Sequence, residues 1–415
     1  ITMAVHVINE ARRCLNCKNP LCRQGCPIYT PIPQMIQAFL NNDINAAGAM
    51  LFENNPLSLV CSLVCDHDKQ CEGHCVLGRK GAPVQISSIE NYISDSYFDR
   101  MVIERKPPNG MKAAIIGGGP AGIAIAIFLA RKGYGVTIFD AKEKIGGILQ
   151  YGIPEFRLPK SILKRYQDKL KDLGVHFRPN TTIGGSIKVD DLFRDGYSSV
   201  FIGTGVWRPN TLGIKGESLG NVHFAINYLN SPDSYDLGER VAIVGAGNSA
   251  MDVARTAIRK GSRHVTIFSP SAHPRASVRE VEYAQIDGVN IVCGKSPIEI
   301  TEEGPIIADV TKDENGNRIY HKDTAELFPA DSTIIAISQG PKDKIVSTTT
   351  GIHTANGGLV ETDTEGHTTR EGVFASGDVV SGAKTVVEAV FHSKKVAAAM
   401  DEYMQKKKAE EEAKK

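Results

Sequence analysis

The sequence predicts an α/β protein in which two Rossmann-like dinucleotide-binding domains, one inserted in the other, follow a small helical domain. Three observations support this prediction: a cysteine block near the start, two copies of a strand, glycine-rich loop and helix, and a short strand ending in glycine and aspartate near the C-terminus. A chain of 415 residues is also too long for one ordinary core. The expected parts are a helical domain at 1–107, a first Rossmann domain at 108–218 and 339–405, an inserted domain at 219–338, and a charged tail at 406–415.

The composition excludes several classes of protein. Apolar residues make up 41% of the chain, and its formal charge is +1, so neither a nucleic acid nor a membrane surface is an expected partner. The longest apolar run, 113–130, is broken by glycines and a proline, which a turn between strand and helix explains better than a membrane span. No basic, apolar leader opens the chain, so we expect a cytoplasmic protein, although Ile1 at the start leaves room for residues upstream.

The cysteine block predicts iron–sulfur clusters. Eight of the nine cysteines form two groups of four, namely Cys14, Cys17, Cys22 and Cys26, and Cys61, Cys65, Cys71 and Cys75. Disulfides suit secreted domains, and structural zinc normally takes two Cys-x2-Cys pairs, of which this block has one. Two [4Fe–4S] clusters use eight thiolates. In ferredoxin-like cysteine runs the fourth cysteine is typically followed by proline, as Cys26 is followed by Pro27 here. We therefore favour two clusters over zinc or disulfides, and interpret the ninth cysteine, Cys293, as a packed free thiol at a strand end.

Helices are expected between the two cysteine groups. The spacing of apolar residues predicts them over 32–40 and 46–52. Such a domain is expected to depend on bound metal as much as on apolar burial. The segment 106–110, with its prolines and glycine, is the predicted linker out of it.

The first dinucleotide fingerprint follows this linker. The strand 112–116 leads into a G-x-G-x-x-G loop and an apolar helix, and the loop glycines are Gly117, Gly119 and Gly122. In this fingerprint the first glycine makes the turn, the second lets a pyrophosphate approach the backbone, and the third packs helix on strand. A second strand, 136–139, ends at Asp140, which is placed to accept a hydrogen bond from a ribose hydroxyl.

The same arrangement recurs in the predicted insertion. The strands 240–244 and 265–268 flank a second loop and helix, and the loop contains Gly245, Gly247, Asn248 and Ser249, with Ala250 in place of the third glycine. Alanine is allowed there. A degenerate Rossmann fold that binds nothing is the alternative, but strand, loop and helix are all intact. We therefore expect two dinucleotides, one a flavin and one a nicotinamide.

The C-terminal segment indicates which of the two Rossmann domains binds the flavin and which binds the nicotinamide. A short strand ends in Gly377 and Asp378, and a helix is expected over 385–400, starting at Thr385. Such a strand can place Asp378 against a ribityl hydroxyl and direct the helix N-terminus toward a flavin ring. The first Rossmann domain is therefore expected to bind FAD, and the inserted domain NADH or NADPH.

With these motifs in place, the chain resembles the small (beta) subunit of bacterial glutamate synthase. The same module is similar to the N-terminal module of dihydropyrimidine dehydrogenase and to the large subunit of NADH-dependent ferredoxin–NADP transhydrogenase. The resemblance runs from residue 11 to about 399. Besides the cysteine groups, it rests on the segments 146–159, 203–205, 248–255 and 336–340.

The resemblance implies ligands for each cofactor. It assigns one cluster to Cys14, Cys17, Cys22 and Cys75, and the other to Cys26, Cys61, Cys65 and Cys71. Mammalian-type dihydropyrimidine dehydrogenase has glutamine in place of one ligand, whereas Cys61 makes this chain similar to the all-cysteine glutamate synthase type. The flavin positions that it implies are Gly117, Gly119, Gly122, Asp140, Gly205 and Asp378. Gly147, in the segment 146–159, and Thr385, at the start of the C-terminal helix, are further expected cofactor-binding residues. The expected nicotinamide positions are Gly245, Gly247, Asn248 and Ser249.

The chain departs from the family pattern after the second strand of the inserted domain. Many members that use NADPH have adjacent arginines there, which clamp the 2′-phosphate. Here only Arg275, with Arg279 beyond it, could reach such a phosphate, and an acidic residue for the 2′-hydroxyl of NADH is missing too. NADH is the favoured donor.

The predicted function is electron input to a larger enzyme. No cysteine lies between residues 76 and 292, so a redox-active disulfide beside the flavin is excluded. Electrons are expected to pass from NAD(P)H through FAD and the clusters to a partner subunit with the terminal acceptor site, as in glutamate synthesis or pyrimidine reduction. One alternative is a subunit of an electron-bifurcating transhydrogenase that engages ferredoxin. A redox-silent scaffold is the alternative from another class, and the intact ligand sets argue against it.

Overall fold

The computed structural model describes residues 2–414, which divide into two compact units. The first unit comprises the described residues up to Gln150, Glu155–Val206, and the described residues from Pro341 onward. The second comprises Tyr151–Pro154 and Trp207–Gly340. An inserted unit is therefore present, and its main segment begins at Trp207 and ends at Gly340. The cysteine-rich N-terminal part belongs to the same compact unit as the first Rossmann sheet.

The N-terminal part of the first unit is helical. Its elements are α1 (Thr2–Arg12), α2 (Leu21–Gln24), α3 (Ile32–Leu40), α4 (Ile44–Asn54), α5 (Ser58–Val64), η1 (Val76–Arg79) and α6 (Ile86–Phe98). The predicted helix at 32–40 is confirmed, and the one at 46–52 lies within the longer α4. Met35 and Ile36 of α3 and Ile89 and Ile93 of α6 are completely buried in one apolar cluster. This part therefore has an apolar core of its own, larger than the cysteine-rich sequence led us to expect.

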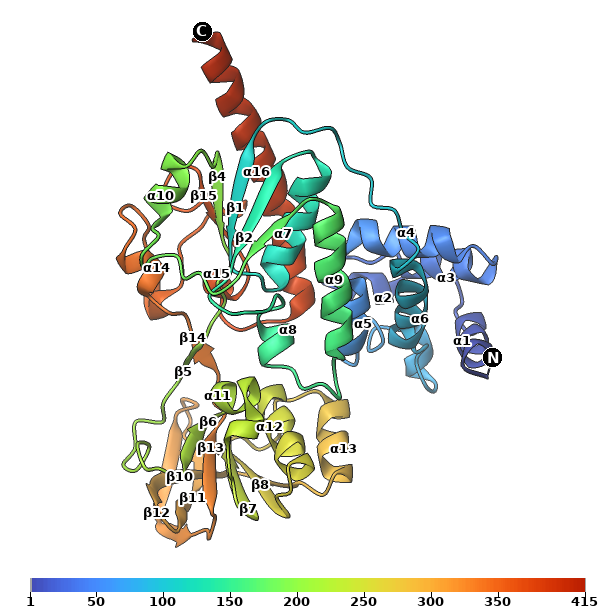
Figure 1. Ribbon diagram of the computed structural model, residues 1–415. Coiled ribbons are helices and arrows are strands. Elements are labelled where there is room, and N and C mark those ends of the chain that lie inside the picture. The colour runs from blue at the N-terminus through green and yellow to red at the C-terminus, as the bar shows by residue number, and fades with distance from the viewer. Residues whose placement is uncertain (1, 415) are drawn as a thin grey trace. The chain divides into compact units, whose positions relative to one another are not determined.

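The rest of the first unit is built on a parallel sheet with the strand order β15-β4-β1-β2-β3. Its strands are β1 (Lys112–Ile116), β2 (Gly135–Phe139), β3 (His176–Arg178), β4 (Ser199–Ile202) and β15 (Val373–Ala375). The helices are α7 (Pro120–Arg131), α8 (Ile148–Tyr151, whose last residue falls in the second unit), α9 (Lys160–Asp172), α10 (Val189–Arg194), α14 (Lys344–Ser347), η3 (Asn356–Gly358), α15 (Asp378–Ser381) and α16 (Val386–Ala413). Helices α7 and α16 lie side by side (Figure 1).

The second unit repeats this plan with the strand order β6-β13-β7-β8-β9. Its parallel strands are β6 (Val222–Phe224), β7 (Arg240–Val244), β8 (His264–Ser269), β9 (Asn290–Cys293) and β13 (Ser332–Ile335). Its helices are α11 (Ala225–Asn230), η2 (Pro232–Ser234), α12 (Asn248–Arg259) and α13 (Val278–Ile286). Two antiparallel sheets complete it, with strands β10 (Lys295–Thr301), β11 (Gly304–Lys312) and β12 (Arg318–Leu327), and β5 (Arg208–Pro209) paired with β14 (Gln339–Gly340).

Two expectations need correction. The helix predicted over 385–400 is longer than expected, because α16 runs on to Ala413 and includes most of the charged tail, whose lysine, glutamate and alanine residues favour a solvated helix. Cys293 does end strand β9 as predicted, but its side chain is partly exposed rather than fully packed. The physical reason is that β9 is an edge strand of its sheet.

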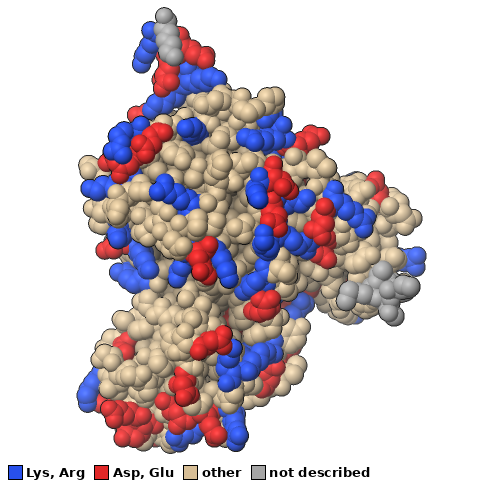
Figure 2. Space-filling model, in the orientation of Figure 1, with Lys and Arg blue, Asp and Glu red and all other residues tan. Residues whose placement is uncertain are grey.

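The surface carries charges of both signs. On the face drawn in Figure 2, basic and acidic side chains are interspersed. Within the described part of the chain, none of the helices has the length and apolar character needed to cross a bilayer.

Candidate cofactor and metal sites

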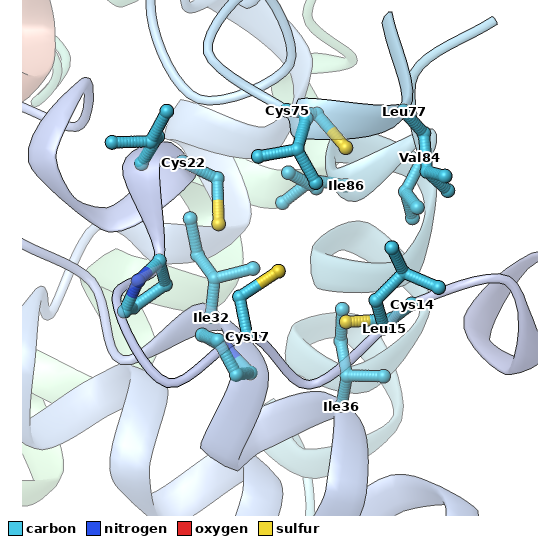
Figure 3. Close-up of a pocket in the computed structure, with 14 residues that line it drawn as sticks. Cys14, Leu15, Cys17, Cys22, Ile32, Ile36, Cys75, Leu77, Val84 and Ile86 are labelled. Carbon is cyan, nitrogen blue, oxygen red and sulfur yellow. The ribbon is translucent and has the colours of Figure 1, made fainter. Parts of the chain in front are cut away.

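Four cysteines surround one cavity in the helical part. Cys14, Cys17, Cys22 and Cys75 line it together with apolar side chains such as Ile36 of α3 (Figure 3). The cavity is partly open to solvent. The labelled sulfur atoms stand around this space rather than meeting at one point (Figure 3). Among residues 2–414, no three or more His, Cys, Asp or Glu side chains are grouped as they would be around one metal ion. The cavity suits a group larger than one ion.

The other four cysteines also lie together. The thiol of Cys65 interacts with those of Cys61 and Cys71, and the thiol of Cys71 interacts with that of Cys26. Cys26, Cys61 and Cys71 are buried, whereas Cys65 and the four thiols of the first set are partly exposed. The fold therefore brings the eight cysteines together in the two sets that the family resemblance implies.

Because they are buried, these cysteine thiols lose their protons less readily than free thiols when no metal is bound. Burial raises the pKa of Cys22 to about 11, and it also raises the pKa values of Cys14, Cys26 and Cys71, because an apolar environment disfavours the charged form. Neighbouring thiols act in the same direction at Cys14 and Cys22. Iron ions would reverse this balance on binding, since a cation stabilises the thiolates that ligate it. The donor set thus fits iron–sulfur clusters.

Three buried polar residues around the second set were not anticipated from the sequence. His67 places Nδ1 3.4 Å from the Cys71 sulfur and Nε2 3.2 Å from the Ser62 carbonyl oxygen. Glu72 accepts hydrogen bonds from the backbone N–H and hydroxyl of Ser87, at 2.8 and 2.6 Å. Burial, with a contribution from Glu72, raises the pKa of Glu90 to about 8. The sequence did contain a sign that Glu90 is buried, because this residue lies next to Ile89 in the apolar pattern Ile86, Ile89, Ile93 of α6.

Several segments of the first unit converge at the N-terminus of α7. The Gly146 N–H donates to the Gly118 carbonyl at 2.8 Å, which sets the turn containing Gly147 against the glycine-rich loop. A Cβ at Gly117 would lie 2.4 Å from the carbonyl oxygen of Gly203, so the turn leading to Gly205 crowds the loop as well. The loop itself is held by Asp140, which accepts the Gly118 N–H at 2.6 Å.

The three fingerprint glycines differ in what surrounds them. A Cβ at Gly122 would lie 1.9 Å from the Gly117 carbonyl oxygen, so this position has no room for a side chain. A Cβ at Gly119 would meet nothing closer than 3.9 Å, which leaves space over the loop and the helix N-terminus. This open cradle of N–H groups is what a pyrophosphate requires.

The predicted acids and the C-terminal helix complete this group. Asp140 also accepts the N–H of Lys142 at 2.8 Å, and burial raises its pKa. Burial likewise raises the pKa of Asp378 to about 6. Thr385 caps α16 in a reciprocal capping box with Glu388. The predicted flavin positions are therefore gathered around the two helix N-termini of α7 and α16.

The predicted nicotinamide positions gather at the N-terminus of α12 in the second unit. Gly245 has a φ of 114°, and a Cβ there would lie 2.4 Å from the Ala336 carbonyl oxygen. Gly247 is open, since a Cβ added there would have nothing within 4 Å, and Ser249 is exposed. Arg275 lies beside this loop, since its N–H donates to the Ala246 carbonyl at 2.8 Å. The Asn248 side chain accepts the Ser277 N–H at 2.9 Å, which ties the Arg275 segment to the loop.

Two family models match the chain. The pyridine nucleotide-disulphide oxidoreductase family matches residues 111–393, and the dihydropyrimidine dehydrogenase domain II, 4Fe-4S cluster, matches residues 2–102. The first covers the flavin and nicotinamide parts, and the second covers both cysteine groups.

Curated relatives are similar over nearly their whole length. The glutamate synthase [NADPH] small chain of Halomonas elongata is 34% identical over 426 residues, which cover 95% of this chain and 90% of that protein. Its Escherichia coli counterpart is 32% identical, with 94% and 89% covered. The NAD-dependent dihydropyrimidine dehydrogenase subunit PreT of Salmonella typhimurium is 30% identical, with 96% and 94% covered.

Solved structures share the fold. FprA from Mycobacterium tuberculosis in complex with NADPH has a TM-score of 0.62 and 17% identity, with 74% of this chain and 86% of that chain covered. Thioredoxin reductase of T. acidophilum has a TM-score of 0.54 and 22% identity, with 71% and 98% covered. Taken with the family matches and the curated relatives, the two Rossmann units and the cysteine-rich helical part establish that the chain is an oxidoreductase of the pyridine nucleotide-disulphide oxidoreductase family, in the group of the glutamate synthase small chains.

Proposed function

We propose that this chain is the electron-input subunit of a larger enzyme. It oxidises NAD(P)H, reduces FAD, and delivers single electrons through two [4Fe–4S] clusters to an acceptor site on a partner subunit. The observation that carries the proposal is the grouping of eight cysteines into two separate sets of four. Four thiolates are what one [4Fe–4S] cluster takes. The relatives support the partner, because they are named as small chains or subunits.

The chain's own residues would bind and orient the cofactors rather than act as acids or bases. Bound FAD exchanges a hydride with a nicotinamide and single electrons with clusters, so it links the two kinds of chemistry. The open loop at Gly119 and the N-terminus of α7 would hold its pyrophosphate. Asp140 would accept a ribose hydroxyl and Asp378 a ribityl hydroxyl. Gly247 and the N-terminus of α12 would hold the nicotinamide dinucleotide in the second unit.

The two clusters would have different positions in the electron path. The set containing Cys61 is the more buried one, and it lies against α9 of the flavin-binding part, as Tyr166 shows by donating to the Pro56 carbonyl at 2.8 Å. The set containing Cys14 lines a cavity that is partly open to solvent. Electrons would therefore pass from the flavin to the buried cluster, then to the more exposed one, and then to the partner.

The donor we propose is NADH. The loop after β8 carries no pair of adjacent arginines, and the backbone of Arg275 is held to the loop at Ala246. The names of the relatives include both donors, NADPH for the glutamate synthase small chains and NAD for PreT. Steady-state oxidation of the two nucleotides with an artificial acceptor decides between them. A kcat/KM for NADPH equal to or above that for NADH would refute the preference.

An anaerobic titration tests the function as a whole. The full chain, reconstituted with FAD, iron and sulfide under argon, is titrated with NADH and then NADPH while flavin and cluster absorbance are followed together. The proposal predicts that one nucleotide bleaches both chromophores. Flavin bleaching without cluster reduction would contradict the proposed electron path, and would point instead to clusters of very low potential, such as those of a bifurcating enzyme that reduces ferredoxin. A chain that binds no flavin would overturn the proposal.

A further inference from the structure

Helix α9 of the flavin-binding part docks on the cysteine-rich part of the same compact unit. The Arg165 guanidinium donates to Asp95 Oδ1 at 2.6 Å and to Asp99 Oδ1 at 2.8 Å, both at the C-terminal end of α6. One turn further along α9, the Lys169 ammonium donates to the Met101 carbonyl at 3.0 Å. Residues 165 and 166 each neighbour residue 169 on the surface of the helix, four and three positions before it. This part of the helix surface is therefore fixed against α6 and the segment after it.

Between these two anchors, Tyr166 reaches toward the second cysteine set. Its side chain is completely buried, and its ring contacts Phe98 with a centroid distance of 4.5 Å. Its hydroxyl donates to the Pro56 carbonyl at 2.8 Å, two residues before α5, the helix that carries Cys61. The Tyr166 hydroxyl is thereby held beside the start of α5, the helix that contains Cys61.

A second contact from the flavin-binding part flanks the same region. Helix α16 contacts α5, and its Lys394 ammonium donates to the Asn54 carbonyl at 3.4 Å. The Phe391 ring of α16 lies 6.5 Å from the ring of Tyr29, which follows Cys26 by three residues. In contrast, the cavity around Cys14 is lined only by residues between 14 and 86. The two cysteine sets therefore differ in which parts of the chain enclose them.

We propose that the second four-cysteine site is a composite of two domains, in which Tyr166 of the flavin-binding part seals the cluster held by Cys26, Cys61, Cys65 and Cys71. The inference rests on the proposed function for the presence of that cluster. The apolar shell around a metal site controls access of water to it. The ring of Tyr166 supplies part of that shell, so removing it exposes the iron to exchange with water and chelators. The cluster at Cys14 has no such dependence.

Iron release tests this proposal on the full chain. Wild type and the variants Tyr166→Ala, Tyr166→Phe and Lys164→Ala are reconstituted with FAD, iron and sulfide under argon and then mixed with EDTA. In Tyr166→Ala, about half of the roughly eight irons should leave about tenfold faster than in wild type, while the rest leave at the wild-type rate. Tyr166→Phe, which keeps the ring, and Lys164→Ala, whose side chain is 66% exposed on the same helix, should both behave like wild type.

Other outcomes are equally informative. Release from Tyr166→Ala at the wild-type rate, or equal acceleration for all of its iron, would overturn the composite site. Flavin absorbance and thermal unfolding show whether this variant is folded. If it is not, Arg165→Ala, which removes the docking contacts with Asp95 and Asp99 and the stacking of the guanidinium on the Phe98 ring, should still accelerate release of half of the iron. A wild-type rate there would refute the proposal. A wild-type chain that takes up no iron would instead contradict the proposed function.

Discussion

The substitution Gly122→Ala should separate the packing of the first loop from its ligand binding. A Cβ at this position would lie 1.9 Å from the Gly117 carbonyl oxygen and 3.2 Å from Cγ2 of Ile115. The added Cβ and the Gly117 carbonyl oxygen must move apart by about 1.1 Å to reach 3.0 Å, and real Cβ atoms essentially never come closer than that to another atom. The atom in the way belongs to the backbone, so it cannot rotate aside. Helix α7 must therefore move away from β1.

The expected cost follows from the rigidity of this contact. Overpacking a well-packed site costs about 1–3 kcal/mol, and the upper end applies when backbone has to shift. About 3 kcal/mol corresponds to a fall in Tm of about 6–12 °C for a unit of this size. Because the helix N-terminus moves as well, FAD affinity should fall with stability.

The matched control is Gly119→Ala, in the same loop. A Cβ there meets nothing closer than 3.9 Å, and Gly119 has φ −76° and ψ −172°, an extended conformation that alanine adopts readily. Thermal unfolding of flavin-free protein, with flavin content measured by absorbance, should show a lower Tm only for Gly122→Ala and loss of FAD for both. An unchanged Tm for flavin-free Gly122→Ala would refute the packing argument.

Three further substitutions test other parts of the fold. Gly247→Ala should leave Tm unchanged, since its Cβ meets nothing within 4 Å, yet raise the Kd for NADH, as measured by fluorescence titration. Thr385→Ala removes the cap of α16 and should cost about 1 kcal/mol and weaken FAD binding, with Thr385→Ser as the control that keeps the cap. Burial alone would raise the pKa of Asp401, but hydrogen bonds from Lys132 and Tyr134 lower it overall, so its stabilising effect is present above its ordinary pKa and is lost as pH falls through the lowered value. Asp401→Asn should therefore cost about 1–2 kcal/mol in urea unfolding at pH 7, and the difference from wild type should shrink as the pH is lowered. A difference that stays constant over the whole acidic range in which the protein is folded would contradict this.

Elements next to the glycine-rich loops could be predicted almost to the residue. Strands β1 and β7 have the predicted bounds, because a strand buried on both faces is a continuous apolar run that ends at the loop glycines. The C-terminal helix was predicted too short, since residues 401–413 are mostly charged and the spacing of apolar residues ends near Met400. That helix is held instead by contacts far away in sequence, among them the hydrogen bond from Tyr134 to Asp401 at 2.6 Å.

The candidate sites were predictable only where one short segment forms them. Cysteine spacing indicates clusters, but it does not say that Cys75 belongs with Cys14 rather than with Cys71, because that pairing depends on how the helices pack. The family resemblance supplied it. Tyr166 could not be recognised at all, since a tyrosine in the apolar stripe of α9 is indistinguishable from any core residue of the flavin-binding part. Its contact with Pro56 spans 110 residues.

The two loops also show how one fingerprint allows two packing distances. Gly122 and Ala250 occupy the same position, yet a methyl group has no room at the first unless the backbone shifts, and is present and completely buried at the second. The helix after the second loop must therefore stand farther from its strand than the helix after the first. Both loops keep a positive φ at their first glycine and open space at their second, Gly119 and Gly247. What the two sites share is thus the backbone turn and the room for a ligand, whereas the contact of helix on strand is free to differ.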